Sequence, residues 1–429
     1  MTLEQTQADI GTDAVDSTRR RSMVALFTGV ALTSTAWVAA STAATLIAGD
    51  AAGASWSGAP NAAGVLGSAI GTTWLSARMA RNGRRYGLLL GYGTAVGGAV
   101  IAVLAAQSGT LALLAVGMVL LGVGNGGAQL SRYAAADLYP PHRRSAMLSI
   151  IVWSGTVGAI IGPALLTATA DLAGRAGVVP LAGPFLLAGV VAVVVIVVTT
   201  AVAPTPTTDA AGAEAEKAPP VREMIRLPVT KVALITMISS QVSMVAVMTM
   251  TPLHLHQHGH GLGTIGLVLS GHLLGMFALS PLTGRLADRI GGYRTSLAGF
   301  GTLLVAVLCA VAAGDGPLLF LALFLLGYGW NLGLVGGSGL LTVGLTTAGR
   351  TKLQGVVDSA SWTASALASI IAGILLGSVG FGALAAATGA GLALAGAGVL
   401  VVGRRAGVGT TRPEPAVPVA GPEPGDRSD

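Results

Sequence analysis

The chain has 429 residues, of which 52% are hydrophobic and only 10% are charged, and its mean hydropathy is +0.74. Soluble domains carry about 25% charged residues, so this composition excludes a soluble enzyme and indicates a membrane protein of many spans. The net charge of +6 would suggest nucleic acid as a partner in a soluble protein. Here the basic residues cluster at the ends of apolar segments, so we expect the lipid bilayer as a partner and no nucleic acid.

Residues 1–21 are polar and lack the early apolar core of a cleaved signal peptide, so we expect a cytoplasmic N-terminal tail. Twelve segments after it reach the roughly 20 apolar residues that a span needs. In chain order they are 22–48, 60–79, 87–106, 110–134, 146–170, 180–202, 229–253, 263–284, 295–313, 317–343, 355–377 and 380–402. The predicted fold class is an all-α membrane protein, with twelve transmembrane helices in two halves of six.

The middle of the chain differs in composition from the apolar segments around it. Residues 204–228 are rich in Pro, Ala, Thr and charge, which predicts a flexible cytoplasmic linker. It separates an N-terminal six-helix bundle, 22–203, from a C-terminal six-helix bundle, 229–403. The tail over 404–429 has a similar composition, and we expect it to be disordered.

The basic residues predict the orientation of the spans. With the N-terminus in the cytoplasm, 23 of the 24 Lys and Arg residues fall on the cytoplasmic side, and only Arg175 does not. This asymmetry follows the positive-inside rule and supports an even number of spans. We expect both termini in the cytoplasm and the chain in the cytoplasmic membrane of a bacterium.

The two halves resemble each other in sequence. The loop after the eighth segment reads GRLADRIGGYR, residues 284–294, and SARMARNGRR stands 208 residues earlier, at 76–85. Internal repeats of this kind are typical of transporters, whose substrate site lies near the bilayer midplane between the repeats. The sequence has no phosphate-binding loop, so we expect neither ATP as an energy source nor an enzymatic activity.

Two pairs of soft ligands lie on the seventh and eighth segments. Met244 and Met248 are four residues apart, as are His272 and Met276, so each pair shares one face of a helix. Thioether and imidazole together suit a soft metal such as Cu(I). Methionine pairs are also common in packed cores, and His272 could instead serve as a proton relay.

Four more histidines, His254, His256, His258 and His260, follow the seventh segment in the predicted outer loop. If this stretch is extended, the alternating positions point several imidazoles the same way. The tract is then either a metal-collecting vestibule or a polar, solvated loop. Histidine-rich tracts favour metal binding but are not specific for one metal.

Polar residues inside the other segments suggest further roles. Arg132 is a candidate for proton coupling or a snorkelling anchor at the cytoplasmic end of its helix. Asp358 is either a coupling carboxylate or a helix-end residue that the helix dipole favours. Asn125, Gln129, Trp330 and Asn331 favour an organic substrate instead, and a packing role suits Trp330 as well.

The loop 284–294 resembles the loop motif of the major facilitator superfamily, with Asp288, Arg289 and Gly291 at its Asp-Arg-x-Gly positions. The resemblance covers residues 20–403 and implies that this loop gates the cytoplasmic ends of the helices. The first-half copy carries Ala80 in place of the expected Asp. The segment Gly158–Pro163 is similar to the Gly-Pro motif common in the antiporters of that superfamily.

Met244-Val-Ala-Val-Met248 and His272-Leu-Leu-Gly-Met276 resemble the motifs of the CcoA-like copper importers, which carry them on the same two spans. The resemblance implies copper as the transported substrate, with no cofactor, and these four residues as its path. That group also includes relatives linked to riboflavin uptake.

The sequence thus predicts a monomeric secondary transporter that imports copper by alternating access. Two alternatives stay open: a carrier of a small organic molecule, such as riboflavin or a drug, with or without proton coupling, and a metal receptor that uses a transporter fold.

Overall fold

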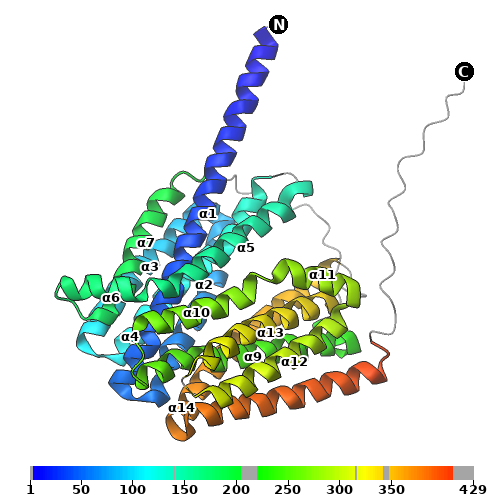
Figure 1. The fold of residues 1–429 in the computed structure, drawn as a ribbon. Helices are drawn as coiled ribbons and strands as arrows, with labels where there is room; N and C mark the ends of the chain where they lie inside the picture. The colour runs from blue at the N-terminus through cyan, green and yellow to red at the C-terminus, as the bar shows by residue number, and fades with distance from the viewer. Residues whose placement is uncertain (1–2, 140, 204–219, 315, 342–346, 409–429) are drawn as a thin grey trace, which may run out of the picture.

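A computed structural model describes residues 3–139, 141–203, 220–314, 316–341 and 347–408. Within these ranges every regular element is a helix (Figure 1). The first half contains α1 (Leu3–Ala52), η1 (Ala54–Trp56), α2 (Ala59–Asn82), α3 (Arg84–Ser108), α4 (Leu111–Asp137), α5 (Pro141–Ala164), α6 (Leu166–Arg175), η2 (Pro180–Ala182) and α7 (Gly183–Thr199). The second contains α8 (Val221–Arg226), α9 (Pro228–Gln257), α10 (Leu262–Phe277), α11 (Ser280–Ile290), α12 (Gly292–Ala313), α13 (Leu318–Leu340) and α14 (Thr347–Arg405). The predicted all-α fold is confirmed.

In the described part of the chain, nine helical stretches are long and apolar enough to cross a membrane, or ten if the pair α5 and α6, bent by 53°, counts as one. One of the nine, Val356–Arg405, contains both of the last two predicted segments, which meet at Gly380. The helix α2 has the length of a span but is less apolar. The described residues of the twelve predicted segments lie mostly in helices, with short breaks such as the one at Leu165, and residues 342–343 of the tenth segment lie outside the described residues.

The predicted N-terminal tail and the predicted linker both contain helix that the sequence analysis did not expect. The predicted N-terminal tail is helical from Leu3, because extending an existing helix by another residue is far easier than nucleating one. The predicted linker contains the short helix α8, whose Met224 is buried. Residues 204–219 and 409–429, the remainder of the linker and most of the C-terminal tail, lie outside the described residues.

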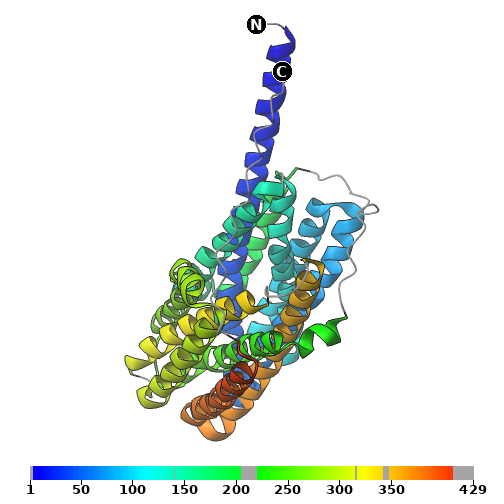
Figure 2. The same cartoon turned by 90° about the vertical axis from the view of Figure 1, so that its right-hand side faces the viewer.

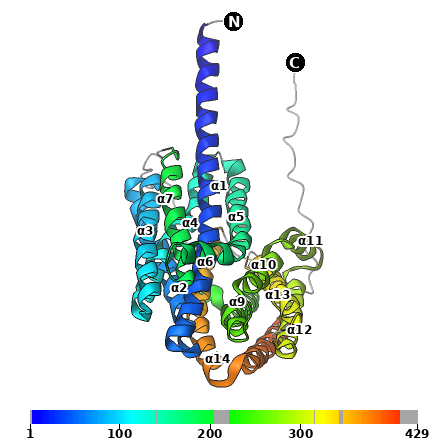
Figure 3. The same cartoon turned by 60° about the vertical axis from the view of Figure 1, so that its left-hand side comes forward.

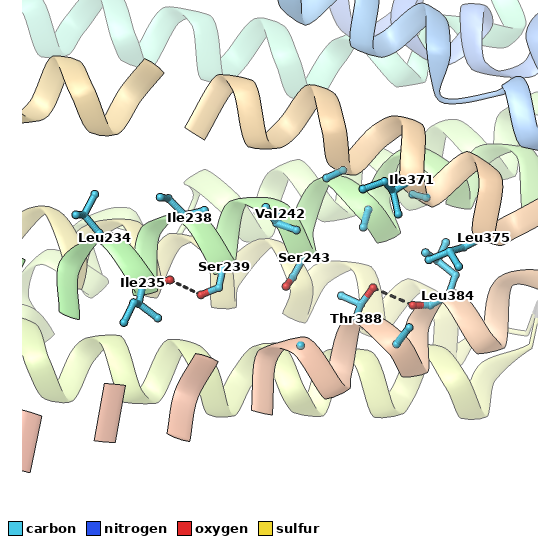
Figure 4. A pocket seen from close by; sticks show the side chains of 15 residues that line it. Leu234, Ile235, Ile238, Ser239, Val242, Ser243, Ile371, Leu375, Leu384 and Thr388 are labelled. Atoms are coloured by element: carbon cyan, nitrogen blue, oxygen red, sulfur yellow. Dashed lines mark hydrogen bonds between the residues drawn. The ribbon is translucent and has the colours of Figure 1, made fainter. Parts of the chain in front are cut away.

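The helices pack as two bundles (Figures 2 and 3). One apolar core consists of side chains from the first half, including Leu26, Tyr92 and Phe185. The other draws mainly on the second half, including Val232 and Leu303, with a few residues of the first half at its edge. The space between these two cores is where a substrate would have to pass.

The sequence repeat reappears in the backbone. Gly83 joins α2 to α3 with φ 86° and ψ 160°, and Gly291 joins α11 to α12 with φ 81° and ψ 157°. The two glycines are 208 residues apart, the offset of the sequence repeat. A residue with a Cβ is strained at these angles, so glycine is required at both turns.

The bundles meet at the end away from the N-terminus. Ser369 Oγ of α14 donates to the Gly58 carbonyl at 3.0 Å, and Asn61 Nδ2 of α2 donates to Ser369 Oγ at 3.1 Å. On α9, His256 Nε2 lies 3.6 Å from Asp50 Oδ2 of α1. Figure 3 shows α2, α9 and α14 converging at this end. With the orientation that the basic residues predict, these contacts close the outer side.

Candidate substrate cavity

A cavity of about 270 Å³ lies between the two bundles. The helices α1, α4 and α5 form the first-bundle wall, and α10 and α14 contribute one aromatic residue each from the second bundle. The lining residues are Val30, Ser34, Trp37, Val38, Asn125, Ala128, Gln129, Arg132, Ile151, Gly155, Thr156, Ala159, Phe277 and Trp362. The cavity thus combines three aromatic rings with several hydrogen-bonding groups.

The polar groups of the cavity come from the first bundle. Asn125 is held by a bond from its Nδ2 to Ser68 Oγ of α2, at 3.2 Å. Gln129 lies one turn further along α4 and is open to solvent. The Arg132 guanidinium lies 5.0 Å from the ring centre of Tyr133, and its buried Nε has no hydrogen-bond partner. Arg132 is therefore a cation at the cavity wall whose hydrogen-bonding capacity is not exhausted.

Arg132 and Asp358, the two candidate coupling residues, lie in opposite bundles, on α4 and α14. The Asp358 carboxylate is near enough to be influenced by the charge of Arg132, yet no direct ion pair joins the two in the described residues. The two positions have no evident connection in the sequence, and the tertiary structure places their charges within electrostatic range of each other.

The second-bundle wall is aromatic, and hydrogen bonds hold it in place. The Phe277 and Trp330 rings pack edge to face, with centroids 6.0 Å apart and an interplanar angle of 75°. Trp330 Nε1 donates to Gln241 Oε1 at 2.7 Å, and Gln241 Nε2 donates to Ser365 Oγ at 2.9 Å. Trp330, an expected cavity residue, thus lies behind Phe277 rather than on the cavity surface.

Asn331, the other second-half candidate for an organic substrate, also bonds within its own bundle. It is buried, and its Nδ2 donates to Ser280 Oγ at 2.7 Å. The bond matches the Asn125–Ser68 bond of the first bundle, since both connect the second and fourth spans of their halves. Asn331 therefore connects α13 to α11, whereas the sequence had suggested that it binds substrate.

Three of the four predicted soft ligands come together. Met244, Met248 and Met276 belong to one apolar cluster with Leu273 and Ala368, and this cluster touches Val38, Ala159 and Ile160 of the first bundle. The sulfur-bearing residues therefore lie at the interface of the bundles. None of them is among the lining residues of the cavity.

His272, the fourth predicted ligand, is buried against α13. Its Nδ1 lies 2.8 Å from the Leu323 carbonyl oxygen, and Nε2 has no partner. The close approach depends on Gly327, because a Cβ there would collide with the His272 carbonyl. No three His, Cys, Asp or Glu side chains of the described residues gather closely enough to hold a metal ion.

The histidine tract is mostly helical. The prediction of a loop is wrong for His254 and His256, because α9 continues to Gln257 with its last turn anchored by the buried Leu253 and Leu255. His254 stacks on Phe381 with centroids 4.3 Å apart, and its Nε2 lies 3.0 Å from the Gly314 carbonyl.

The other histidines divide between two sides of the chain. His258 packs on His254, with ring centroids 4.4 Å apart, and its Nδ1 bonds to the His254 carbonyl at 2.8 Å. His256 instead faces Asp50, and His260 follows the helix end. Helical spacing therefore brings His254 and His258 together and turns His256 away, where an extended segment would have aligned all three.

The predicted gating loop lies at the end of α11. Asp288 and Arg289 are exposed, and Gly291 ends the helix with the positive φ described above. In the described residues, neither charge takes part in an ion pair. The gating role that the resemblance implies stays a prediction.

The sequence interpretation missed the aromatic residues of the cavity and the residue that braces them. Trp37, Phe277, Trp362 and Gln241 received no functional assignment. The only available signal was scarcity, since aromatic residues make up 4% of the chain. Scarcity alone does not tell which aromatic rings face a cavity.

Two helical bundles around a polar and aromatic cavity form the architecture of a membrane transporter. The comparison with known families is specific: the chain belongs to the Major Facilitator Superfamily, whose model matches residues 22–264 and 232–425. An uncharacterized MFS-type transporter of Bacillus subtilis, YdeG, is 34% identical over 376 residues, with 85% of this chain and 86% of that protein covered. Transport across a membrane is therefore the general activity of this protein.

A second similar protein has a named substrate. The riboflavin transporter RfnT of Brucella anthropi is 29% identical over 318 residues, with 74% of this chain and 79% of that protein covered. Among solved structures, the nucleoside transporter NupG shares the fold with a TM-score of 0.67 at 12% identity, covering 90% of this chain and 98% of that one. A bacterial homologue of the lysosomal transporter Spinster aligns with a TM-score of 0.63 at 15% identity, over 91% and 95%. None of these four proteins is named as a copper transporter.

Proposed function

We propose that this protein is a secondary transporter of a small, planar organic molecule of the flavin class. The observation that carries the proposal is the lining of the cavity between the bundles. Trp37, Phe277 and Trp362 surround it together with Asn125, Arg132 and other hydrogen-bonding groups, and no Met or His is among the described lining residues.

The composition of the cavity suits such a substrate. Aromatic side chains bind planar rings by stacking or edge-on contact, and a few polar groups fix the orientation of a ligand in an otherwise apolar site. The cavity volume of about 270 Å³ is close to the lower end of ligand sites, about 300 Å³. The similarity to the riboflavin transporter RfnT adds support.

The two bundles would move the substrate by rocking around the cavity. The contacts between Ser369, Gly58 and Asn61 close one end, so in this state the cavity exchanges with the other, predicted cytoplasmic, side. Rocking would break these contacts and bring Arg132 and Asp358 closer together. The energy would come from an ion or substrate gradient.

Copper is the second candidate substrate, because Met244, Met248 and Met276 meet at the bundle interface. Thioethers bind Cu(I) without losing a proton, so such a cluster could pass the ion along. His272 would have to turn away from the Leu323 carbonyl to join it. The cluster is also apolar and closely packed, which favours a packing role for the methionines.

The test is uptake by the purified protein in liposomes, with riboflavin and copper supplied separately. We expect riboflavin uptake, a loss of about tenfold in Trp37→Ala, and no change in Trp153→Ala, whose side chain is 62% exposed on α5. Copper uptake that Met244→Ala and His272→Ala abolish, without riboflavin uptake, would overturn the proposal in favour of the second candidate.

A further inference from the structure

Gln241, in the middle of α9, uses both ends of its amide within the second bundle. Its Oε1 accepts from Trp330 Nε1 at 2.7 Å, and its Nε2 donates to Ser365 Oγ at 2.9 Å. Ser365 in turn donates to the Ser361 carbonyl at 2.8 Å. One side chain thus ties α9 to α13 on one side and to α14 on the other.

Both partners of Gln241 lead to the aromatic wall of the cavity. Trp330 packs edge to face against Phe277, and Phe277 lines the cavity. Ser365 lies three residues after Trp362, the other aromatic lining residue of the second bundle. Phe277 therefore touches a ring that Gln241 holds, and Trp362 lies about one helical turn from Ser365, which Gln241 also holds.

A polar side chain at this depth needs an explanation. Gln241 and Trp330 are both half-buried. An amide within a membrane span is unfavourable unless its groups are bonded, and an apolar side chain of the same length could fill the space without that requirement. A Trp N–H withdrawn from water also needs an acceptor. Because Gln241 supplies the acceptor, the indole of Trp330 is restricted to one orientation, and Phe277 packs against that orientation.

We propose that Gln241 is a positioning residue for substrate binding: it holds Trp330, and through it Phe277, so that the aromatic wall is preformed. The proposal rests on the proposed function, because it assigns the wall to ring recognition. Gln241 does not touch the substrate. A preformed wall lowers the entropy lost on binding, so its loss weakens substrate binding more than it slows the movement of the bundles.

The first experiment observes Trp330 without any substrate. Protein labelled with 5-fluorotryptophan gives one ¹⁹F resonance for each Trp, and Trp330→Phe identifies that of Trp330. We expect Gln241→Met, which keeps the length of the side chain but removes both hydrogen bonds, to shift or broaden this resonance. The matched control is Ser378→Ala on α14, whose hydroxyl bonds only to carbonyls of its own helix. An unmoved Trp330 resonance in Gln241→Met overturns the inference.

The second experiment measures riboflavin transport. We expect Gln241→Met to raise KM about tenfold, the effect of losing one well-formed hydrogen bond, with kcat changed less than about twofold. The double variant Gln241→Met/Trp330→Phe should be no worse than the more impaired of the two single variants, because both remove the same link. Equal losses in KM and kcat, or additive losses in the double variant, overturn the inference.

Together the two experiments distinguish a failure of the proposed function from a failure of the inference about Gln241. A protein that moves no riboflavin contradicts the proposed function, and the Trp330 resonance still decides whether Gln241 positions that ring. A raised KM with an unmoved resonance would mean that Gln241 acts by another route, and the inference would be wrong.

Discussion

The two walls of the cavity use their polar residues in opposite ways. On the first-bundle wall, Gln129 and Arg132 face the cavity with hydrogen-bonding capacity to spare. Behind the second wall, Gln241, Asn331 and His272 do not line the cavity and bond to their own bundle, although Asn331 Oδ1 and His272 Nε2 have no partner. What the second bundle presents to the cavity is aromatic.

This difference suggests that the first wall recognises the polar groups of a ligand, whereas the second wall provides the shape that fits its ring. Groups that are free to bond can select the polar edge of a ligand, whereas groups that are already bonded hold neighbouring side chains in place. We expect substitutions in the first wall to remove specific contacts and substitutions in the second to change the fit of a ring. The predictions below test that division.

The largest expected effect is at Arg132. Replacing it by Met should lower riboflavin uptake about 100-fold, because a charged hydrogen bond to a ligand contributes about 1.5–3 kcal/mol. Arg132→Lys keeps the charge without the planar fork and should recover part of the activity. Uptake assays in liposomes check this, with Arg78→Met on an exposed position as the control. Full activity in Arg132→Met would contradict the idea that the first wall recognises the substrate.

The next effect concerns a feature that the two halves share. Gly83→Ala and Gly291→Ala should each destabilise the protein by about 1–3 kcal/mol, because an alanine is strained at these positive φ angles. The measurement is thermal unfolding in detergent. Gly284→Ala, in a helix with open space around it, is the control and should be neutral or stabilising. Unequal losses at the two turns would show that the repeat is not energetically symmetric.

A smaller effect is expected at Phe277. Phe277→Ala should raise KM for riboflavin about tenfold, because the substrate loses one aromatic contact of about 0.5–1.5 kcal/mol together with the area that it buries. Phe277→Trp should restore most of the affinity, which a purely local packing defect would not predict. Leu267→Ala on the same helix, 63% exposed, is the control. An unchanged KM would argue that the second wall does not contact the ring.

The smallest effect is at the closed end. His256 and Asp50 are 38% and 52% exposed, so their pairing is weak and requires a protonated imidazole. Because the pairing needs the imidazole in its charged form, acid should slow the opening of this end by about twofold.

The readout for this opening is alkylation of a cysteine at the buried position Ser57, in a Cys309→Ser background, at pH 6 and pH 8. Each rate is divided by the rate for the same protein in denaturant at that pH, because the reactive thiolate itself becomes more abundant as the pH rises. Asp50→Asn and His256→Gln should both abolish the pH dependence of this ratio. A dependence that survives both variants would assign it to other groups, among which His254, His258 and His260 on the same segment are the nearest in sequence.

Much of the fold could be predicted from the sequence, because it depends on local properties. Runs of apolar residues produce the helices, and the turns at Gly83 and Gly291 could be located from the repeat. The end of α9 could not: a histidine-rich stretch looks like a loop, but the burial of Leu253 and Leu255 extends the helix through His256.

The candidate site was predicted only in part. Met244 and Met248, paired by their spacing, lie in one apolar cluster with Met276, while metal binding there stays a prediction. The spacing of His272 and Met276 is equally regular, yet the imidazole bonds to the Leu323 carbonyl. Periodicity specifies which residues share a face of a helix, but it does not specify which neighbour that face meets.

By itself the sequence determined that the chain spans a membrane many times and that its halves repeat, and it predicted which side of the membrane its basic residues occupy, because hydropathy and charge act along the chain. The tertiary structure alone decided that three aromatic rings, Trp37, Phe277 and Trp362, share one cavity with Arg132. These residues come from four helices, α1, α4, α10 and α14, and only the tertiary packing of those helices brings the right faces together.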